Sequence, residues 1–253
     1  MKSIGIIPAR YASTRFPGKP LVDIRGKSMV QRVYEQASKS LLDRVVVATD
    51  DERIFRHVKS FGGRAAMTSP FHKSGTDRCA EIAALEEFKN VELVVNIQGD
   101  EPFIQPGQVD LLVKFLMENK HFPIATLAKL IEKEKELFDP NTVKTVFDKN
   151  GKALYFSRSP MPFLKKEKKE NWLAKSQFYK HIGIYGFYKN TLLEVAKLPQ
   201  GRLEKAESLE QLRWLENGFP IGVQTTDYET VGIDVPADIA ALPMAIEGVA
   251  TKT

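Results

Sequence analysis

The first hundred residues alternate short apolar segments with amphipathic ones, and this alternation limits the possible folds more than any other feature. The apolar segments are rich in β-branched residues, and these occur at successive positions rather than at every second one. Because successive side chains of a strand point to opposite faces, this pattern is typical of strands buried on both faces. The predicted strands are 4–7, 44–49, 64–67 and 93–97, and the predicted helices between and after them are 29–39, 51–61 and 76–88. Strands and helices that alternate in this way favour a parallel sheet flanked by helices.

The second half of the chain has a less regular pattern. Its predicted elements are strands at 124–130, 143–147, 153–156, 183–188 and 221–226, a turn at 148–151, and helices at 191–197 and 208–217. The turn joins two of these strands into a hairpin insertion. No internal repeat and no Gly/Ser-rich or Pro-rich linker divides the sequence. We therefore expect one α/β domain, 1–253, with a mixed, mostly parallel, Rossmann-like sheet and an embedded subdomain at about 124–190.

Bulk composition is that of an ordinary globular protein. With 253 residues, 43% of them hydrophobic, the chain can bury a sizeable core without disulfides or metals. The single cysteine, Cys79, cannot form an internal bridge and is interpreted as a packing residue in a reducing compartment. The apolar run before Pro8 is too short for a signal peptide or a membrane span, so we expect a cytoplasmic protein with no membrane partner.

Charge gives little support for binding to nucleic acid. The chain carries 37 basic and 32 acidic residues, a mild excess, with no continuous basic and aromatic stripe. Small anionic substrates explain this excess equally well. The densest charged run, 165–170, mixes both signs and is predicted to be a solvated loop.

The loop after the first strand, 8–20, combines small residues with cations. Small side chains let backbone N–H groups approach an anion, and cations donate charge-assisted hydrogen bonds to phosphate oxygens. The small residues are Ala9, Ala12, Ser13 and Gly18, and the cations are Arg10, Arg15 and Lys19. The loop has neither P-loop spacing nor the three glycines of a dinucleotide fingerprint. A polyphosphate site and a basic surface loop both remain open from these residues alone.

Acidic residues follow two of the later strands. Polar segments at 8–19, 49–51 and 98–102 end neighbouring strands, so they are expected to meet at the carboxyl edge of the sheet. Asp100 lies in the last of these segments, and Mg²⁺ is commonly held by one or two such carboxylates together with substrate phosphates. Asp234, just before a proline that suits the first turn of a helix, is the second candidate, with helix capping equally open.

The remaining polar residues define no other kind of catalytic site. Hydroxyl groups in 71–78 precede a predicted helix and either recognise a base or cap that helix. Ser13 and Ser74 have no histidine at a spacing that suggests a triad, and one cysteine with scattered histidines does not support zinc. Direct displacement between two substrates is favoured over covalent catalysis.

Several segments, taken together, resemble the 3-deoxy-manno-octulosonate (Kdo) cytidylyltransferases, also called CMP-Kdo synthetases. They are PARYASTR at 8–15, PGKP at 17–20, SGTDR at 74–78, NIQGDEP at 96–102, YFSRSP at 155–160, HIGIYG at 181–186, LEQLR at 209–213 and GIDVP at 232–236. The likeness runs in order over nearly the whole chain. It departs from the family in the charged run 165–170 and at Asp77, where a glutamate is common.

The resemblance implies transfer of CMP from CTP to the anomeric hydroxyl of Kdo, with release of pyrophosphate, in lipopolysaccharide synthesis. It implies a nucleotide-diphospho-sugar transferase-like fold, a homodimer, and Mg²⁺ held by Asp100 and Asp234, with Arg10 and Lys19 completing the catalytic set. The implied nucleotide-binding residues are Pro8, Ala9, Arg10, Ser13, Arg15, Lys19, Ser74, Gly75, Thr76, Arg78 and Gln98. The implied sugar-binding residues are Gln98, Arg158, His181, Tyr185, Glu210 and Gln211.

Each sugar-side residue also has a plainer interpretation. His181 and Tyr185 alternate with apolar residues on a predicted strand and are equally suited to be satisfied core groups. Arg158 is able to pair with any surface acid, and the segment 210–213 fits an exposed helical face. Two rival functions remain at this stage: a cytidylyltransferase for another acid sugar such as sialic acid, and a nucleotide-binding regulator without catalysis.

Overall fold

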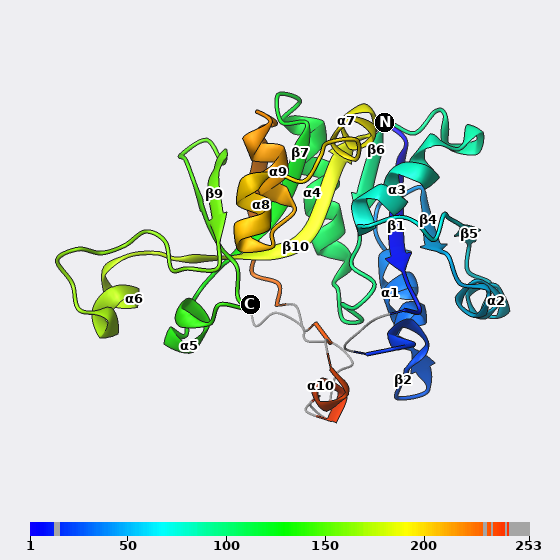
Figure 1. Cartoon of the computed structure of the whole chain (residues 1–253), viewed down its shortest axis with the longest axis horizontal. Helices are drawn as coiled ribbons and strands as arrows, with labels where there is room; N and C mark the ends of the chain where they lie inside the picture. Colours follow the sequence, from blue (N-terminus) through cyan, green and yellow to red (C-terminus); the bar gives the residue numbers. More distant parts are fainter. Residues whose placement is uncertain (13–15, 230–231, 234, 241, 243–253) are drawn as a thin grey trace.

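A twisted nine-stranded sheet forms the centre of the described chain in the computed structural model (Figure 1). The described residues are 1–12, 16–229, 232–233, 235–240 and 242. The main strands run in the order β11, β7, β10, β6, β1, β4, β5. Their bounds are β1 Ser3–Ala9, β4 Arg44–Thr49, β5 Ala65–Met67, β6 Leu93–Asn96, β7 Ile124–Leu130, β10 Tyr179–Tyr188 and β11 Ile221–Thr225.

The directions of these strands confirm the predicted mixed, mostly parallel sheet. β1 pairs in parallel with β4 and β6, β4 pairs in parallel with β5, and β11 pairs in parallel with β7. β10 is antiparallel to both of its long neighbours, β6 and β7. In the sheet, β10 therefore lies between the parallel strands β6, β1, β4 and β5 on one side and β7 and β11 on the other.

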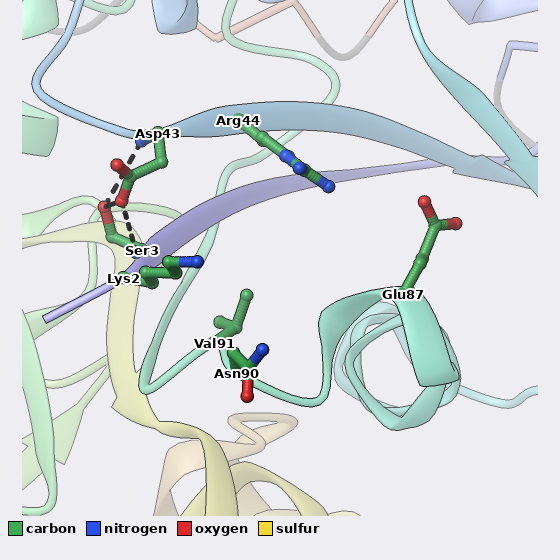
Figure 2. Close-up of a pocket in the computed structure, with 7 residues that line it drawn as sticks. All are labelled: Lys2, Ser3, Asp43, Arg44, Glu87, Asn90 and Val91. Carbon is green, nitrogen blue, oxygen red and sulfur yellow. Dashed lines mark hydrogen bonds between the residues drawn. The ribbon is translucent and has the colours of Figure 1, made fainter.

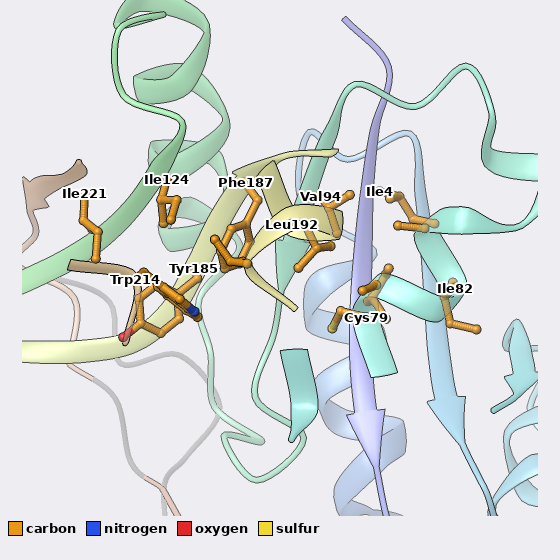
Figure 3. Packing of buried hydrophobic residues seen from close by; sticks show 14 of the residues in the cluster. Ile4, Cys79, Ile82, Val94, Ile124, Tyr185, Phe187, Leu192, Trp214 and Ile221 are labelled. Atoms are coloured by element: carbon orange, nitrogen blue, oxygen red, sulfur yellow. The ribbon is translucent and has the colours of Figure 1, made fainter. Parts of the chain in front are cut away.

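Helices cover both faces of the sheet, and each face has its own apolar cluster. On one face, α1 (Met29–Ala37), α2 (Glu52–Ser60) and α4 (Pro106–Glu118) pack on Ile7 and its neighbours. On the other face lie α3 (Gly75–Ala84), α7 (Lys189–Val195) and α9 (Gln211–Glu216), where Ile4, Val94, Phe187 and Trp214 pack together (Figure 3). Strands buried from both sides explain the continuous apolar runs in the sequence.

Cys79 belongs to the second of these clusters, as predicted. Its side chain is fully buried on α3, between the sheet and the neighbouring helix (Figure 3). Burial raises the pKa of its thiol, which keeps the sulfur in the unreactive protonated form.

The predicted hairpin is formed by β8 (Lys144–Phe147) and β9 (Ala153–Ser157), and it projects from the main sheet with two short helices (Figure 1). These helices are α5 (Glu134–Phe138) and α6 (Trp172–Lys175), and a small cluster that includes Leu137, Trp172 and Phe178 fills the space between them. The charged run 165–170 is mainly exposed and leads into a 3₁₀ turn at Lys169–Asn171, η3. We refer to residues 131–178 as the arm.

The structure differs from the predicted elements in several places. β10 begins at Tyr179 rather than at residue 183, and α4 was not predicted because its apolar positions show little helical contrast. The predicted helix 208–217 is shorter, since Ser208 has a φ of 54° and separates α8 (Arg202–Glu207) from α9. A small hairpin of β2 (Asp23–Ile24) and β3 (Lys27–Ser28) was also not predicted.

Two shorter elements complete the description. A 3₁₀ turn, η1, spans Lys19–Leu21, and another, η2, spans Glu86–Phe88. The proline-opened helix near the end of the chain is α10, Pro236–Ala240. Within the described ranges, no helix has the length and apolarity needed to cross a membrane.

Candidate functional site

Three chain segments meet at Pro8, near the end of β1. A Cβ atom added to Gly75 would lie 3.1 Å from Pro8 Cγ, and one added to Gly99 would lie 2.8 Å from the Pro8 carbonyl oxygen. Both glycines therefore permit a close approach that a larger residue would obstruct. The predicted meeting of segments 8–19 and 98–102 at one edge of the sheet is confirmed by the approach of Gly99 to Pro8, whereas the approach of Gly75 was not predicted.

The cationic loop begins at this point. Ala9 is buried at the end of β1, and Arg10 is exposed just after it. Farther along, the N–H of Gly18 donates to the carbonyl of Tyr11 at 2.9 Å, and the φ of 72° at Gly18 lets the chain turn back. Ser13 and Arg15, two of the predicted phosphate contacts, lie outside the described residues.

Lys19 forms an ion pair with Asp100 across this edge. Lys19 Nζ lies 2.8 Å from Asp100 Oδ2, and the two side chains are 12% and 40% exposed. The pair joins the cationic loop to the segment after β6, although 81 residues separate the two positions. Two of the predicted catalytic residues are therefore in direct contact.

The described segment 232–233, near the end of the chain, also reaches Asp100. The N–H of Ile233 donates to the Asp100 carbonyl at 3.0 Å. Asp234 itself lies outside the described residues, so its role as metal ligand or helix cap stays a prediction. The contact of its neighbour Ile233 places this part of the chain at the same edge as the Lys19–Asp100 pair.

Asp100 is chemically suited to bind Mg²⁺. Its ion pair with Lys19 uses Oδ2, which leaves Oδ1 of a partly exposed carboxylate for a hard cation. Among the described residues, no group of three His, Cys, Asp or Glu side chains is placed to hold a metal. Mg²⁺ does not need such a group, since one or two carboxylates with substrate phosphates and water complete its coordination. The donor set therefore fits Mg²⁺ better than a metal that needs an all-protein site.

Ser74 caps the helix that starts beside Pro8. Ser74 Oγ accepts a hydrogen bond from the N–H of Asp77 at 3.1 Å, and Asp77 in return accepts from the N–H of Ser74, which forms a capping box. The capping interpretation of this segment is thus confirmed. Gly75 and Thr76 form the first turn of α3, where backbone N–H groups remain suited to contact a nucleotide.

Arg78 lies in the protein interior, whereas the prediction placed it where it contacts the nucleotide. It is fully buried, its Nη2 donates to Asp50 Oδ2 at 2.9 Å, and its Nη1 donates to Thr68 Oγ1. These bonds connect α3 to the ends of β4 and β5. No catalytic or binding role was predicted for Asp50, and the structure shows that it forms an ion pair with the buried Arg78.

His181 lies in β10, on the predicted sugar side of the site. Its Nε2 lies 2.8 Å from Thr126 Oγ1, and the Thr126 hydroxyl donates to the Ile184 carbonyl at 2.8 Å, so the histidine N–H donates to the hydroxyl. Burial lowers the pKa of His181 to about 3, which keeps the ring neutral. The contact of Thr126 with His181 was not predicted. A polar threonine within an otherwise apolar strand was the sequence feature that could have indicated it.

Tyr185 and Glu210 place polar atoms in the interior without a hydrogen-bond partner among the described residues, although Glu210 Oε1 lies 3.9 Å from Arg213 Nη2 in an ion pair. The Tyr185 hydroxyl and Glu210 Oε1 have no hydrogen bond, while Glu210 Oε2 accepts from Thr76 Oγ1 at 2.8 Å. Burial raises the pKa of both groups. Buried polar atoms are rarely left unpaired, so these are candidates for contact with a ligand or with water.

The other predicted sugar-side residues are less directly connected. Gln98 follows β6 and is partly buried, and Gln211 is buried in α9. Arg158 donates from Nε to the Glu207 carbonyl at 2.8 Å and from Nη1 to the Pro140 carbonyl at 3.0 Å. Within the described chain, its hydrogen bonds reach no other predicted sugar-side residue.

The alternative interpretation of 210–213 as an exposed helical face is wrong. Gln211 and Trp214 are buried, and Arg213 forms two hydrogen bonds to Glu204, at 2.7 and 2.6 Å. This helix is held by a buried ion pair rather than by solvent-exposed charges.

Glu101 is a further residue that sequence analysis missed. Burial, together with the charge of neighbouring Asp100, raises the pKa of Glu101 to about 8. Its Oε2 has no hydrogen-bond partner among the described residues. Its position directly after Asp100, at the end of a strand, was the sequence feature that could have indicated a functional role.

Another pocket lies at the opposite edge of the sheet, with a volume of about 380 Å³ (Figure 2). Its lining residues are Lys2, Ser3, Asp43, Arg44, Glu87, Asn90 and Val91. They surround the amino ends of β1 and β4, and none belongs to the predicted site. This pocket is separate from the carboxyl edge where Pro8, Lys19 and Asp100 meet.

A family model described as cytidylyltransferase matches residues 4–226, so the fold and the site define a cytidylyltransferase. The 3-deoxy-manno-octulosonate cytidylyltransferase of Parabacteroides distasonis is 54% identical over 243 residues, covering 94% of this chain and 96% of the relative. That of Thermodesulfovibrio yellowstonii is also 54% identical, over 246 residues, with the same coverage. The chain belongs to the 3-deoxy-manno-octulosonate cytidylyltransferase family.

A solved structure supports the same assignment. It is a CMP:2-keto-3-deoxy-manno-octonic acid synthetase complexed with CTP, and it superimposes with a TM-score of 0.87 at 41% sequence identity. The match covers 95% of this chain and 96% of that one. The fold assignment therefore extends over nearly the whole chain.

Proposed function

We propose that this protein transfers CMP from CTP to the anomeric hydroxyl of Kdo, which gives CMP-Kdo and pyrophosphate for lipopolysaccharide synthesis. The observation that carries this proposal is the Lys19–Asp100 ion pair, which lies at the sheet edge where the Pro8, Gly75 and Gly99 segments meet. The family of the chain supplies the identities of nucleotide and sugar. Neither a sialic acid enzyme nor a non-catalytic regulator is favoured by this family.

The reaction requires positioning and charge stabilisation rather than a protein nucleophile. The sugar oxygen forms a bond to the α-phosphorus while the bond from that phosphorus to pyrophosphate breaks, so negative charge grows on the leaving group. Lys19 is held at this edge by Asp100, and Arg10 is exposed nearby in sequence. Both cations are suited to stabilise the departing pyrophosphate, with Arg15 and Ser13 completing the phosphate contacts.

Mg²⁺ is the proposed cofactor, held by Asp100 and Asp234. When bound, the ion would polarise the α-phosphate and lower the pKa of the sugar hydroxyl. Asp100 contributes a carboxylate that Lys19 orients from the side of the phosphate loop. Lys19 thus both fixes the metal-binding carboxylate and supplies positive charge.

The nucleotide base is proposed to contact the start of α3. Ser74, Gly75 and Thr76 present the first turn of this helix beside Pro8 and Ala9, and Arg78 holds the helix in place through Asp50. On the sugar side, the proposed contacts are Gln98, Arg158, His181, Tyr185, Glu210 and Gln211. Thr76 connects the two sides through its hydrogen bond to Glu210.

A homodimer of single-domain subunits in the cytoplasm is the proposed form of the protein. The arm supports dimer formation because it projects from the sheet and carries exposed apolar side chains, including Leu154, 59% exposed, and Phe163, 71% exposed. Light scattering during size-exclusion chromatography tests this, with twice the chain mass expected. Replacing Leu154 and Phe163 by polar residues should then give a monomer, and an unchanged dimer would exclude this surface.

The catalytic proposal is tested by measuring pyrophosphate release with CTP, Kdo and Mg²⁺, and by identifying the sugar product by mass spectrometry. UTP and ATP serve as nucleotide controls. We expect CMP-Kdo to form with CTP and release to be much slower with UTP or ATP. Release without Kdo, or no CMP-Kdo in a reaction with folded protein, would contradict the proposal.

A further inference from the structure

A β-bulge interrupts β10 at the sugar side of the site. Ile182 pairs with Leu127 and Tyr185 pairs with Thr126, so β10 contains extra residues between positions that are adjacent on β7. The Thr126 hydroxyl lies at this irregularity, 3.2 Å from the Ile182 carbonyl and 2.8 Å from the Ile184 carbonyl. Bulges next to active sites redirect side chains, and this one places Gly183 at its centre.

Gly183 differs from a neighbouring strand glycine in what surrounds it. At Gly186, an added Cβ would lie 2.8 Å from Leu116 Cδ1, so packing within the protein explains that glycine. At Gly183, the nearest described atoms would be Gln98 Cγ at 3.8 Å and Glu101 Oε1 at 4.0 Å, which are ordinary contact distances. The backbone of Gly183 also has no left-handed φ that would require glycine.

A glycine inside a strand weakens the strand, and it often marks a place where a ligand or another backbone comes close. Neither backbone conformation nor contact with a described residue accounts for glycine at position 183. A Cβ atom at this position would make ordinary contacts with the side chains of Gln98 and Glu101. A ligand that approaches the β10 backbone at this point would account for the glycine.

Glu101 provides a polar group beside this position. Its Oε2 is buried and has no hydrogen-bond partner among the described residues, while its Oε1 is the oxygen nearest to the Gly183 position. Leaving a buried polar atom unpaired destabilises the free protein. A bound molecule with hydroxyl groups would remove this destabilisation.

We propose, on the basis of the proposed function, that Gly183, Gln98 and Glu101 form a slot that receives hydroxyl groups of the acid sugar. Glu101 binds one or more of these hydroxyls, and Gly183 sets how closely the sugar approaches β10. The carboxyl group of Glu101 is able to form hydrogen bonds to hydroxyl groups in either protonation state. The slot therefore positions the hydroxyl-bearing part of the sugar beside β10.

Two substitutions test the slot by steady-state kinetics with both substrates varied. Gly183→Ala adds a methyl group that the free protein accommodates, so it should raise KM for Kdo about 10-fold or more. Glu101→Gln changes the hydrogen-bonding group with little change in size and should raise KM for Kdo about 5–10-fold. In both variants KM for CTP should change less than about 2-fold. Glu118→Gln, an exposed acid at the end of α4, is the matched control and should match the unsubstituted protein.

The outcomes separate the slot from the function on which it rests. If the unsubstituted protein makes no CMP-Kdo, the proposed function is wrong. If that protein is active and both variants keep its KM for Kdo, the slot is wrong. An equal rise of KM for CTP and Kdo in either variant would also overturn the slot, because it would indicate general damage to the site rather than loss of a sugar contact.

Discussion

The proposed nucleotide side and the proposed sugar side of this site are built in different ways. On the nucleotide side, the functional groups stand at strand ends and in loops, and Lys19 and Asp100 form a charged pair that is partly open to solvent. On the sugar side, His181 and Tyr185 lie within a strand, and Glu210 stands next to a buried helix. The proposed nucleotide side thus presents charged groups, and the proposed sugar side presents polar groups whose pKa shifts favour the neutral form.

The pKa shifts follow the same division. Burial lowers the pKa of His181 and raises those of Tyr185 and Glu210, so each shift favours the neutral form. Neutral groups recognise sugar hydroxyls by hydrogen bonds of fixed geometry, whereas charges stabilise the growing negative charge of pyrophosphate. Substitutions on the two sides should therefore affect different kinetic constants.

The largest expected effect comes from Asp100→Asn. The substitution keeps the shape of the side chain and removes its negative charge, so turnover should fall about 1,000-fold while CTP binding weakens much less. Rates at saturating substrates and calorimetric titration with CTP measure the two quantities. Asp227→Asn, at an exposed position, is the control. Full activity of the Asp100 variant would remove this residue from the metal site.

The next effect concerns Lys19→Ala. Loss of the ammonium group leaves the charge on pyrophosphate without this partner and frees Asp100 from its ion pair, so kcat should fall about 100-fold. KM for Kdo should change little because Lys19 belongs to the nucleotide side. Lys39→Ala, an exposed lysine after α1, controls for loss of positive charge. A kcat near that of the unsubstituted protein would exclude Lys19 from catalysis.

A pH series tests the buried, neutral state of His181. Its pKa falls from 6.5 to about 3 on folding, so the unfolded chain binds more protons between these values. The free energy of unfolding should therefore decrease as pH drops below about 6.5, by up to ~1.4 kcal/mol per unit from this group. Denaturant unfolding of the unsubstituted protein and of His181→Gln between pH 6.5 and 4.5 measures the difference. Parallel pH profiles would show that His181 is not held neutral.

The smallest effect is expected for Tyr185→Phe, which removes only an unpaired hydroxyl. Stability should stay within ~1 kcal/mol or rise, because the hydroxyl has no hydrogen bond among the described residues. KM for Kdo should rise about 5-fold if the hydroxyl contacts the sugar, with KM for CTP unchanged. Thermal unfolding and two-substrate kinetics check both expectations. A clear loss of stability with unchanged KM would instead make this tyrosine a structural core residue.

The sequence predicted the parallel half of the molecule well for a physical reason. Strands such as Arg44–Thr49 are buried on both faces and therefore appear as continuous apolar runs, and parallel topology brings their ends together. The meeting of Pro8 and Gly99 followed from that topology, whereas the approach of Gly75 to Pro8 was not predicted. Lys19 and Asp100 were predicted to belong to the same site, but the ion pair between them was not predicted.

The sugar side was less predictable because its chemistry depends on neighbours from distant parts of the chain. The bulge at Gly183 arises from pairing between β10 and β7, and Thr126 gains its role only through that pairing. The helix break at Ser208 uses a left-handed conformation that serine rarely adopts. Glu210 and its neighbours have a sequence typical of an exposed helix, and only the fold buries them.

The most direct test of the account compares kcat/KM for Kdo and for sialic acid at saturating CTP. The nucleotide side is able to handle CTP in either reaction, so the difference isolates the enclosed sugar side. We predict that Kdo is preferred at least about 100-fold, because polar groups buried for one sugar are left unpaired by another. Equal values for the two sugars would contradict the claim that the sugar side selects Kdo.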